Sequence, residues 1–273
     1  ISSLILFVAF WVGTMAQTNV STYSGEKFNS LDGGIENKVK ATIIYDNYIH
    51  KEGMQEDWGY SLLLEGLNKT ILFDTGTNPK IFKSNFEKLK LDASSIDEVF
   101  ISHEHGDHFG GLHEFLLMNN KVKVVVPATF TKRFLTEYSD ECAGIELISD
   151  ASQICNHLYS TGVLGQNIPE QALVLNTLNG LVVMTGCSHP GIIEMLSTIK
   201  TTFKSDIYLV FGGFHLMNRS DKEIEKIIEE MKELGVKKCG ATHCTGEKQI
   251  ELFRLAFGKD FVEMGAGNVI TFE

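Results

Sequence analysis

The most chemically informative part of the chain is a run of three histidines and one aspartate that directly follows an apolar segment, residues 99–101. The spacing is His103, His105, Asp107 and His108. Alternate side chains of an extended segment point the same way, so His103 and His105 can face one ion. Asp107 and His108 begin the next element and can face a second. Imidazole and carboxylate are the ligands of catalytic zinc, although iron and manganese accept the same groups. The run therefore predicts a site for one or two ions, with zinc as the expected metal.

Regular elements on both sides of this run must position it. Apolar and β-branched stretches predict strands at 39–45, 61–65, 70–73, 96–102, 122–126, 172–176, 181–185, 207–211, 236–242 and 269–272, with short strand candidates near 146–148 and 154–159. Helical spacing predicts helices from 79 to about 89 and at 108–118, 129–138, 191–201, 221–234 and 247–256. Hairpins dominate the first half, and strands alternate with helices in the second. This order favours two mixed sheets packed face to face, with helices outside.

Length and charge restrict the classes of function. The chain has 273 residues, and we expect one domain over residues 38–273. Its formal net charge is −11, which argues against nucleic acid as a partner because phosphate binding needs a basic surface. We expect a small-molecule substrate, and the sequence does not set the oligomeric state.

The N-terminal residues predict export. An uncharged apolar run at 4–12, followed by Thr14, Met15 and Ala16, is typical of a signal peptide ending at residue 16. The run is too short for a membrane span, so we expect no stable membrane anchor and a secreted or periplasmic protein. Polar residues 17–37 are interpreted as a flexible leader. Five cysteines leave at least one thiol free in an exported protein and leave open a disulfide between Cys142 and Cys155.

Four further motifs accompany the histidine run: L-F-D-T-G at 72–76, G-C-S-H-P-G at 186–191, G-G-F-H-L at 212–216 and T-H-C-T-G at 242–246. With H-x-H-x-D-H and the segment 56–65, they resemble the metallo-β-lactamase superfamily over nearly the whole chain after residue 16. The nearest resemblance within it is to the group of the archaeal dihydropterin-linked synthase of methanopterin biosynthesis. The resemblance implies an α+β fold, a four-layer αββα sandwich of two mixed sheets.

The resemblance also implies a ligand set. His189 would complete the first ion site with His103 and His105, and His243 would complete the second with Asp107 and His108. Asp74, in the D-T-G motif, would orient the metal loop from behind.

The sequence leaves the roles of two residues open. Cys187 stands where many members of the superfamily place a bridging aspartate, and its thiolate would bind or bridge an ion or else be a neutral bystander. His215 would contact substrate or phosphate, would donate a proton to the leaving group, or would be a histidine of an ordinary turn.

The expected activity is metal-assisted hydrolysis of a small, phosphorylated or heterocyclic substrate. A bound ion activates water as a nucleophile at neutral pH, Asp107 orients that water and accepts its proton, and His215 protonates the leaving group. Alternatives are a pterin-linked synthase or transferase, or a lactonase, of the same superfamily. An alternative of another class is a metal-binding protein without catalysis.

Overall fold

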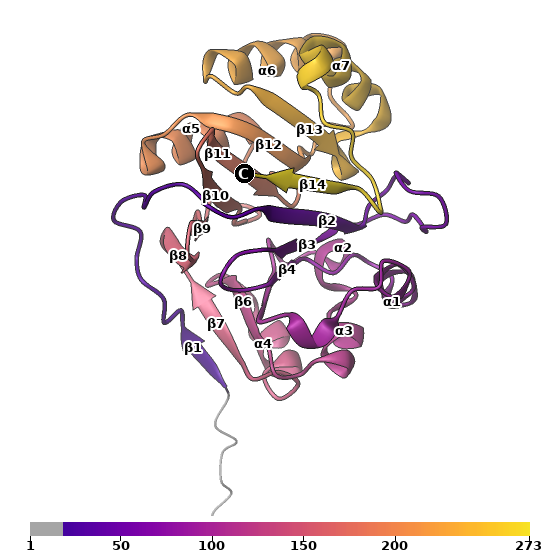
Figure 1. Cartoon of the computed structure of the whole chain (residues 1–273), viewed down its shortest axis with the longest axis vertical. Helices are drawn as coiled ribbons and strands as arrows, with labels where there is room; N and C mark the ends of the chain where they lie inside the picture. Colours follow the sequence, from indigo (N-terminus) through magenta and orange to yellow (C-terminus); the bar gives the residue numbers. More distant parts are fainter. Residues whose placement is uncertain (1–18) are drawn as a thin grey trace, which may run out of the picture.

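The computed structural model describes residues 19–273, which form two mixed β-sheets stacked face to face (Figure 1). Strands form where β-branched and other apolar residues are concentrated, since these side chains pack well on a pleated surface. The first sheet has eight strands, parallel from β4 to β1 and antiparallel elsewhere. In spatial order they are β1 (Val20–Thr22), β7 (Gly144–Ile148), β6 (Lys123–Pro127), β5 (Glu98–Phe100), β4 (Ile71–Phe73), β3 (Ser61–Glu65), β2 (Val39–Tyr45) and β14 (Val269–Phe272).

The second sheet has six strands, of which β11, β12 and β13 run parallel and the others antiparallel. In spatial order they are β13 (Lys238–Thr242), β12 (Ile207–Gly213), β11 (Gly180–Thr185), β10 (Leu173–Thr177), β9 (Leu158–Ser160) and β8 (Ser152–Cys155). The β10–β11 hairpin turns at Leu178 and Asn179, and Gly180 begins β11.

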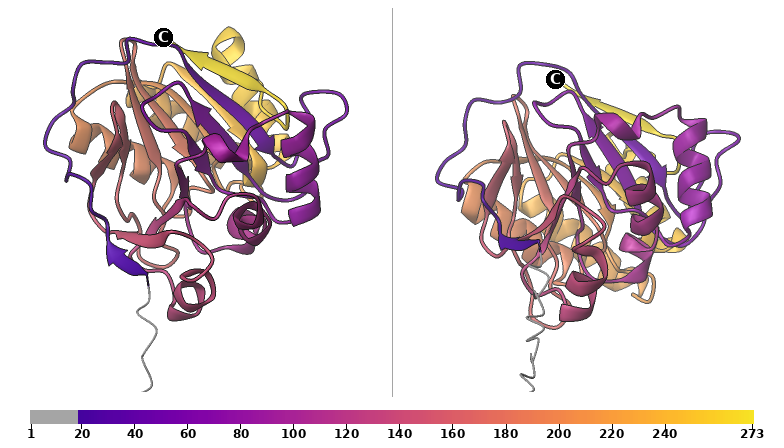
Figure 2. Two further views of the ribbon diagram at one scale, coloured as in Figure 1. Left: turned by 60° about the horizontal axis from the view of Figure 1, so that its bottom comes forward. Right: turned by 90° about the horizontal axis from the view of Figure 1, so that it is seen from below.

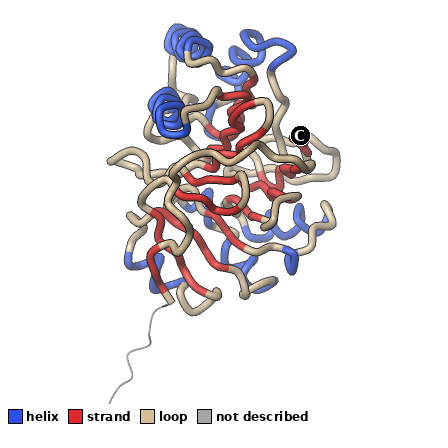
Figure 3. Tube along the Cα trace, turned by 60° about the vertical axis from the view of Figure 1, so that its left-hand side comes forward, coloured by secondary structure: helices blue, strands red, loops and turns tan. Residues whose placement is uncertain are grey.

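Helices cover the outer face of each sheet, and Figure 3 shows the strands between two outer groups of helices. One group packs on the first sheet: α1 (Pro79–Lys88), α2 (Gly106–Phe109), α3 (Leu112–Met118) and α4 (Lys132–Tyr138). The other packs on the second sheet: α5 (Ile192–Phe203), α6 (Asp221–Glu233) and α7 (Glu247–Phe257). Short 3₁₀ turns lie at Ala93–Ser95 (η1), His243–Thr245 (η2) and Gly258–Asp260 (η3). A central core between the sheets joins side chains such as Phe100 and Phe211. The predicted four-layer α+β sandwich is confirmed.

The helix expected over residues 108–118 is two short helices, α2 and α3, separated at Gly110 and Gly111. A Cβ at Gly110 would lie 2.2 Å from the carbonyl oxygen of Thr77, and one at Gly111 would lie 2.3 Å from that of Thr75. The helix therefore breaks where the histidine run is pressed against the turn after β4, and only glycine permits this approach.

The segment expected to be a flexible leader is packed on the domain over residues 19–37. Strand β1 pairs in parallel with β7 at the end of the first sheet, as the views of Figure 2 show. The Phe28 ring lies 4.5 Å from that of Phe203 and 5.5 Å from that of Tyr159, between ring centroids. Ile35 is fully buried in the central core. The polar composition of this segment wrongly suggested flexibility, because a few apolar side chains are enough to pack it against the core of the domain.

The five cysteines are free thiols, so no Cys142–Cys155 disulfide is present. The two residues belong to different cores, Cys142 under the helices of the first sheet and Cys155 between the sheets. The signal peptide expected at residues 1–16 lies outside the described residues. Within residues 19–273, every helix falls short of the length and apolarity needed to cross a bilayer.

Candidate metal centre

All the residues expected to form the site lie at one edge of the sandwich, on the loops and short helical turns that follow strand ends. The first sheet contributes the turn after β4 and the histidine run after β5. The second contributes the loops that follow its three parallel strands, β11, β12 and β13. Parallel neighbours end on the same side, so their carboxyl ends meet without any long loop.

The first group of donor atoms comes from three histidines, His103, His105 and His189, whose ligand atoms lie within 4.8 Å of one another. His103 Nε2 is 3.1 Å from His105 Nδ1. Burial holds the pKa of His103 well below its ordinary value, and neighbouring imidazoles add to the effect. Burial and the nearby His215 lower the pKa of His189 to about 3. These rings are therefore neutral at physiological pH and offer lone pairs.

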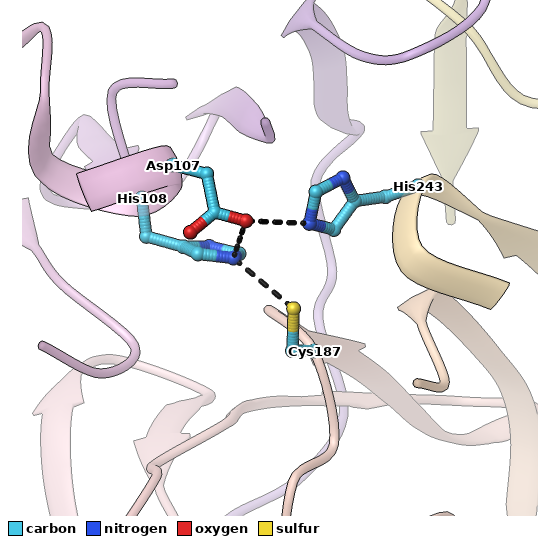
Figure 4. A group of neighbouring side chains, drawn as sticks. All are labelled: Asp107, His108, Cys187 and His243. Atoms are coloured by element: carbon cyan, nitrogen blue, oxygen red, sulfur yellow. Dashed lines mark hydrogen bonds and ion pairs between the residues drawn. The ribbon is translucent and has the colours of Figure 1, made fainter. Parts of the chain in front are cut away.

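The second group contains Asp107, His108, Cys187 and His243, drawn in Figure 4. Asp107 Oδ2 lies 3.4 Å from His243 Nε2 and 3.6 Å from His108 Nε2. His108 Nε2 lies 3.2 Å from the Cys187 sulfur. Burial raises the pKa of Asp107, but the neighbouring imidazoles of His243 and His108 outweigh it and hold the pKa well below its usual range. Asp107 is thus a carboxylate at neutral pH.

Asp74 lies directly behind the histidine run and is fully buried. Its Oδ2 is 2.6 Å from His108 Nδ1, and Ser102 donates to both its oxygens at 2.7 Å. The Ser102 hydroxyl is also 2.9 Å from His103 Nδ1. Each Nδ1 is engaged, so the Nε2 of His103 and His108 is left for an ion.

Asn47, on the loop after β2, engages the Nδ1 of His243, as Asp74 engages that of His108. This residue was not identified from the sequence. Its Oδ1 accepts the N–H of Gly59 at 3.0 Å and lies 2.8 Å from His243 Nδ1. An amide oxygen only accepts, so His243 carries its proton on Nδ1. His243 Nε2 is therefore a lone pair directed at Asp107.

Glu170 is the second missed residue and holds the loop that carries Cys187 and His189. Its Oε1 accepts the backbone N–H groups of residues 186, 187 and 188 at 2.9–3.1 Å, and its Oε2 accepts that of His189 at 2.9 Å. Glu170 is fully buried. Four hydrogen bonds to one carboxylate fix the path of this loop.

Trp58 is the third missed residue and lies at the mouth of the site. Its indole N–H donates to Asp107 Oδ2 at 2.8 Å, and its ring centroid is 5.2 Å from that of His243. The side chain remains 42% exposed. His215 is also exposed, with its ring centroid 4.3 Å from that of His189. The group is thus open to solvent on the side of Trp58 and His215.

Backbone strain is concentrated at this edge. Of the seven non-glycine residues with positive φ in residues 19–273, four belong to the site: Asp74, Ser188, His215 and His243, with φ of 50–63°. Such conformations cost about 1–3 kcal/mol each and persist only where surrounding structure holds them. Here they shape the four loops that follow β4, β11, β12 and β13 and meet at the centre.

Two orphaned nitrogens show that the residues fit a metal. His189 Nε2 and His243 Nε2 are buried and have no hydrogen-bond partner among the described residues. An unsatisfied buried polar atom is costly, and a cation in each group would satisfy it. The donors are imidazole nitrogens, one carboxylate and one thiol, a set suited to zinc and other transition metals rather than to Mg²⁺ or Ca²⁺.

Comparison with known proteins agrees with this geometry. A family model described as the metallo-β-lactamase superfamily matches residues 58–140. A 7,8-dihydropterin-6-methyl-4-(β-D-ribofuranosyl)-aminobenzene-5'-phosphate synthase of Methanocaldococcus jannaschii is 30% identical, over 88% of this chain and 98% of that protein.

Solved structures show the same fold. Tm1679, a metal-dependent hydrolase of the β-lactamase superfamily, matches with a TM-score of 0.72 and 31% identity, over 85% of this chain and 98% of that one. The metallo-β-lactamase fold protein YhfI of Bacillus subtilis matches with a TM-score of 0.64 and 15% identity, over 86% and 99%.

These findings correct one expectation from the sequence, a secreted or periplasmic hydrolase with a signal peptide. The archaeal protein that matches over most of the chain is a synthase, and nothing in the comparisons indicates a signal peptide or secretion. The apolar run at 4–12 was the basis of that expectation and lies outside the described residues.

Proposed function

Because the chain belongs to the metallo-β-lactamase superfamily, we propose that it is a metal-dependent enzyme that joins or transfers a phosphorylated, heterocyclic small molecule. The observation that carries the proposal is the pair of adjacent donor groups with orphaned nitrogens on His189 and His243. We assign the first ion to His103, His105 and His189, and the second to Asp107, His108, Cys187 and His243. Zinc is the expected metal because the donors include imidazole and thiol.

The chain's own residues provide the remaining parts of a catalytic site. A bound ion would supply positive charge that polarises a substrate oxygen and activates a nucleophile. Asp107 would orient that nucleophile and, as a carboxylate, would accept its proton. Its hydrogen bond with Cys244 raises the pKa of His215, which favours the protonated imidazole that donation to a leaving group requires.

The exposed indole of Trp58 supports a heterocyclic substrate. A flat ring that enters the open side would meet the indole face next to His243, and stacking on an aromatic side chain is worth about 1–3 kcal/mol. The name of the archaeal relative contains both a dihydropterin and a 5'-phosphate, which is the class of molecule proposed.

Hydrolysis is the second candidate, and the 31% identity to a metal-dependent hydrolase favours it. A metal-storage protein without catalysis is less favoured, because structural metal sites are closed by their ligands. This centre is open beside Trp58 and His215.

One preparation tests these alternatives. Elemental analysis gives the metal and its stoichiometry. The same protein is assayed by mass spectrometry for product from a ribofuranosyl-aminobenzene 5'-phosphate and a dihydropterin whose 6-methyl carbon carries a leaving group, which departs as the new bond forms. It is also assayed with chromogenic phosphodiester, lactone and thioester substrates. We expect the joined product, lost in His105→Ala with the fold retained. Turnover only of chromogenic esters would favour the hydrolase, and full metal occupancy without turnover of any substrate would refute catalysis.

A further inference from the structure

Three donors at the centre form a third group that contains two sulfurs. The thiols of Cys187 and Cys244 and the imidazole of His215 have ligand atoms within 4.8 Å of one another. Cys244 and His215 belong to neither of the two ion positions assigned above. Cys187 is shared with the second position.

The backbone builds this group before any ion binds. The N–H of His215 donates to the Cys244 sulfur at 3.3 Å, and the Cys244 thiol lies 3.6 Å from the carbonyl oxygen of Cys187. The N–H of Phe214 donates to Thr245 Oγ1 at 3.0 Å, which ties the turn after β12 to η2. The three loops therefore hold one another with the sulfurs directed inward.

Gly213 shows how closely the loops approach. A Cβ at this position would lie 2.7 Å from the Cys244 sulfur and 2.4 Å from the carbonyl oxygen of Gly186. Any side chain there would displace the sulfur. The two cysteines are buried and His215 is exposed, so solvent reaches the group only at the imidazole of His215, and the sulfurs are covered by protein.

We propose that Cys187, Cys244 and His215 form a third ion position, selective for a thiophilic cation such as Cd²⁺ or Cu⁺. Soft thiolate ligands select these cations, whereas the second position contains the hard carboxylate of Asp107. Binding releases the thiol protons to solvent as the metal–sulfur bonds form. Because Cys187 belongs to both positions, a cation here withdraws a donor from the second position, and soft metals inhibit the enzyme by this route.

The test counts the sulfurs around a soft cation and does not depend on turnover. Zinc-loaded protein is titrated with Cd²⁺, and the ultraviolet thiolate-to-cadmium absorption is compared with that of model thiolate complexes. We expect the intensity of two thiolates per Cd²⁺ in the native protein and half of it in Cys244→Ser. Cys142→Ser is the matched control, since this buried thiol lies outside the centre, and it should retain the full intensity.

The outcomes separate this proposal from the proposed function. One thiolate per Cd²⁺ in the native protein, unchanged in Cys244→Ser, would overturn the third position and leave the first two untouched. A two-thiolate signal in a protein without turnover would keep the position and refute the catalytic role. Circular dichroism checks that Cys244→Ser is folded, and Cys244→Ala provides a second variant with the same expected loss of half the signal.

Discussion

The carboxylate of Glu170 provides the sharpest test of how the fold positions the centre. Replacing it by glutamine keeps its volume and one accepting oxygen. That oxygen can remain where the three N–H groups of residues 186–188 converge, but the new NH₂ group then faces the N–H of His189. One hydrogen bond to a charged acceptor is lost, worth about 1.5–3 kcal/mol.

This loss should appear as weaker metal binding at the first position. If the bond is what keeps His189 in its binding conformation, the competent fraction of the loop falls and the apparent Kd rises in proportion. At about 1.4 kcal/mol per tenfold change, a loss of about 1.5–3 kcal/mol corresponds to a roughly 10–150-fold weaker affinity. The second position should change less, because the N–H of Cys187 keeps its acceptor.

Competition with a chromophoric chelator measures both affinities in Glu170→Gln. Glu146→Gln is the matched control, because Glu146 is also a buried carboxylate but is bound by Lys123 and Ser24 far from the centre. A folded Glu170→Gln protein that binds both ions as tightly as the native protein would refute the reasoning. So would an equal loss in the control, since that would reflect general destabilisation.

Three further changes have defined outcomes. Burial lowers the pKa of His108, but Asp74 outweighs it and raises the pKa to about 9. Burial also raises the pKa of the Cys187 thiol well above its ordinary value. An ion at the second position must therefore displace both protons, so its affinity should rise about a hundredfold per pH unit in chelator competition between about pH 6 and pH 8. The first position should be nearly flat over this range, because His189, with a pKa of about 3, is already neutral. Trp58→Ala should raise KM about 5–100-fold because substrate stacking on the indole is lost. Trp58→Phe should keep KM within about threefold and lower kcat, because only the hydrogen bond to Asp107 is lost. Equal KM values in the two variants would contradict stacking of the substrate on Trp58. Phe28→Ala should lower the free energy of unfolding by about 1–2 kcal/mol in urea titrations with metal binding unchanged, and no change would mean that residues 19–37 do not pack in solution.

The four-layer fold and the histidine run could be predicted because their signals are local. The β10–β11 hairpin and the proline-started helix α1 are set by neighbouring residues. His103 and His105 follow an apolar strand directly, so spacing alone suggests a shared ion. His189 and His243 were found by resemblance, and the structure brings them to the same edge.

The supporting residues could not be predicted because their roles depend on distant partners. Asn47 is 196 residues from His243, and nothing in its local sequence indicates that contact. Glu170 lies in the least regular stretch of the chain, where an isolated acid is more often a surface residue. Trp58 belongs to a segment that matched by resemblance, but only its position beside Asp107 shows a function.

Each assigned ion position takes ligands from both sheets, and this explains how strained loops can persist at the centre. The first combines His103 and His105, after β5, with His189, after β11; the second combines Asp107 and His108 with Cys187 and His243. Neither set of ligands is complete until the two sheets pack together. The apolar core between the sheets, which includes Phe100 and Phe211, does not contain the donor residues. The core therefore stabilises the closed arrangement independently of metal, and the positive-φ residues at the edge are held there by it. Hydrogen bonds with Ser102, Asp74 and Asn47 then fix the rings of His103, His108 and His243, so an ion meets donors that are already oriented.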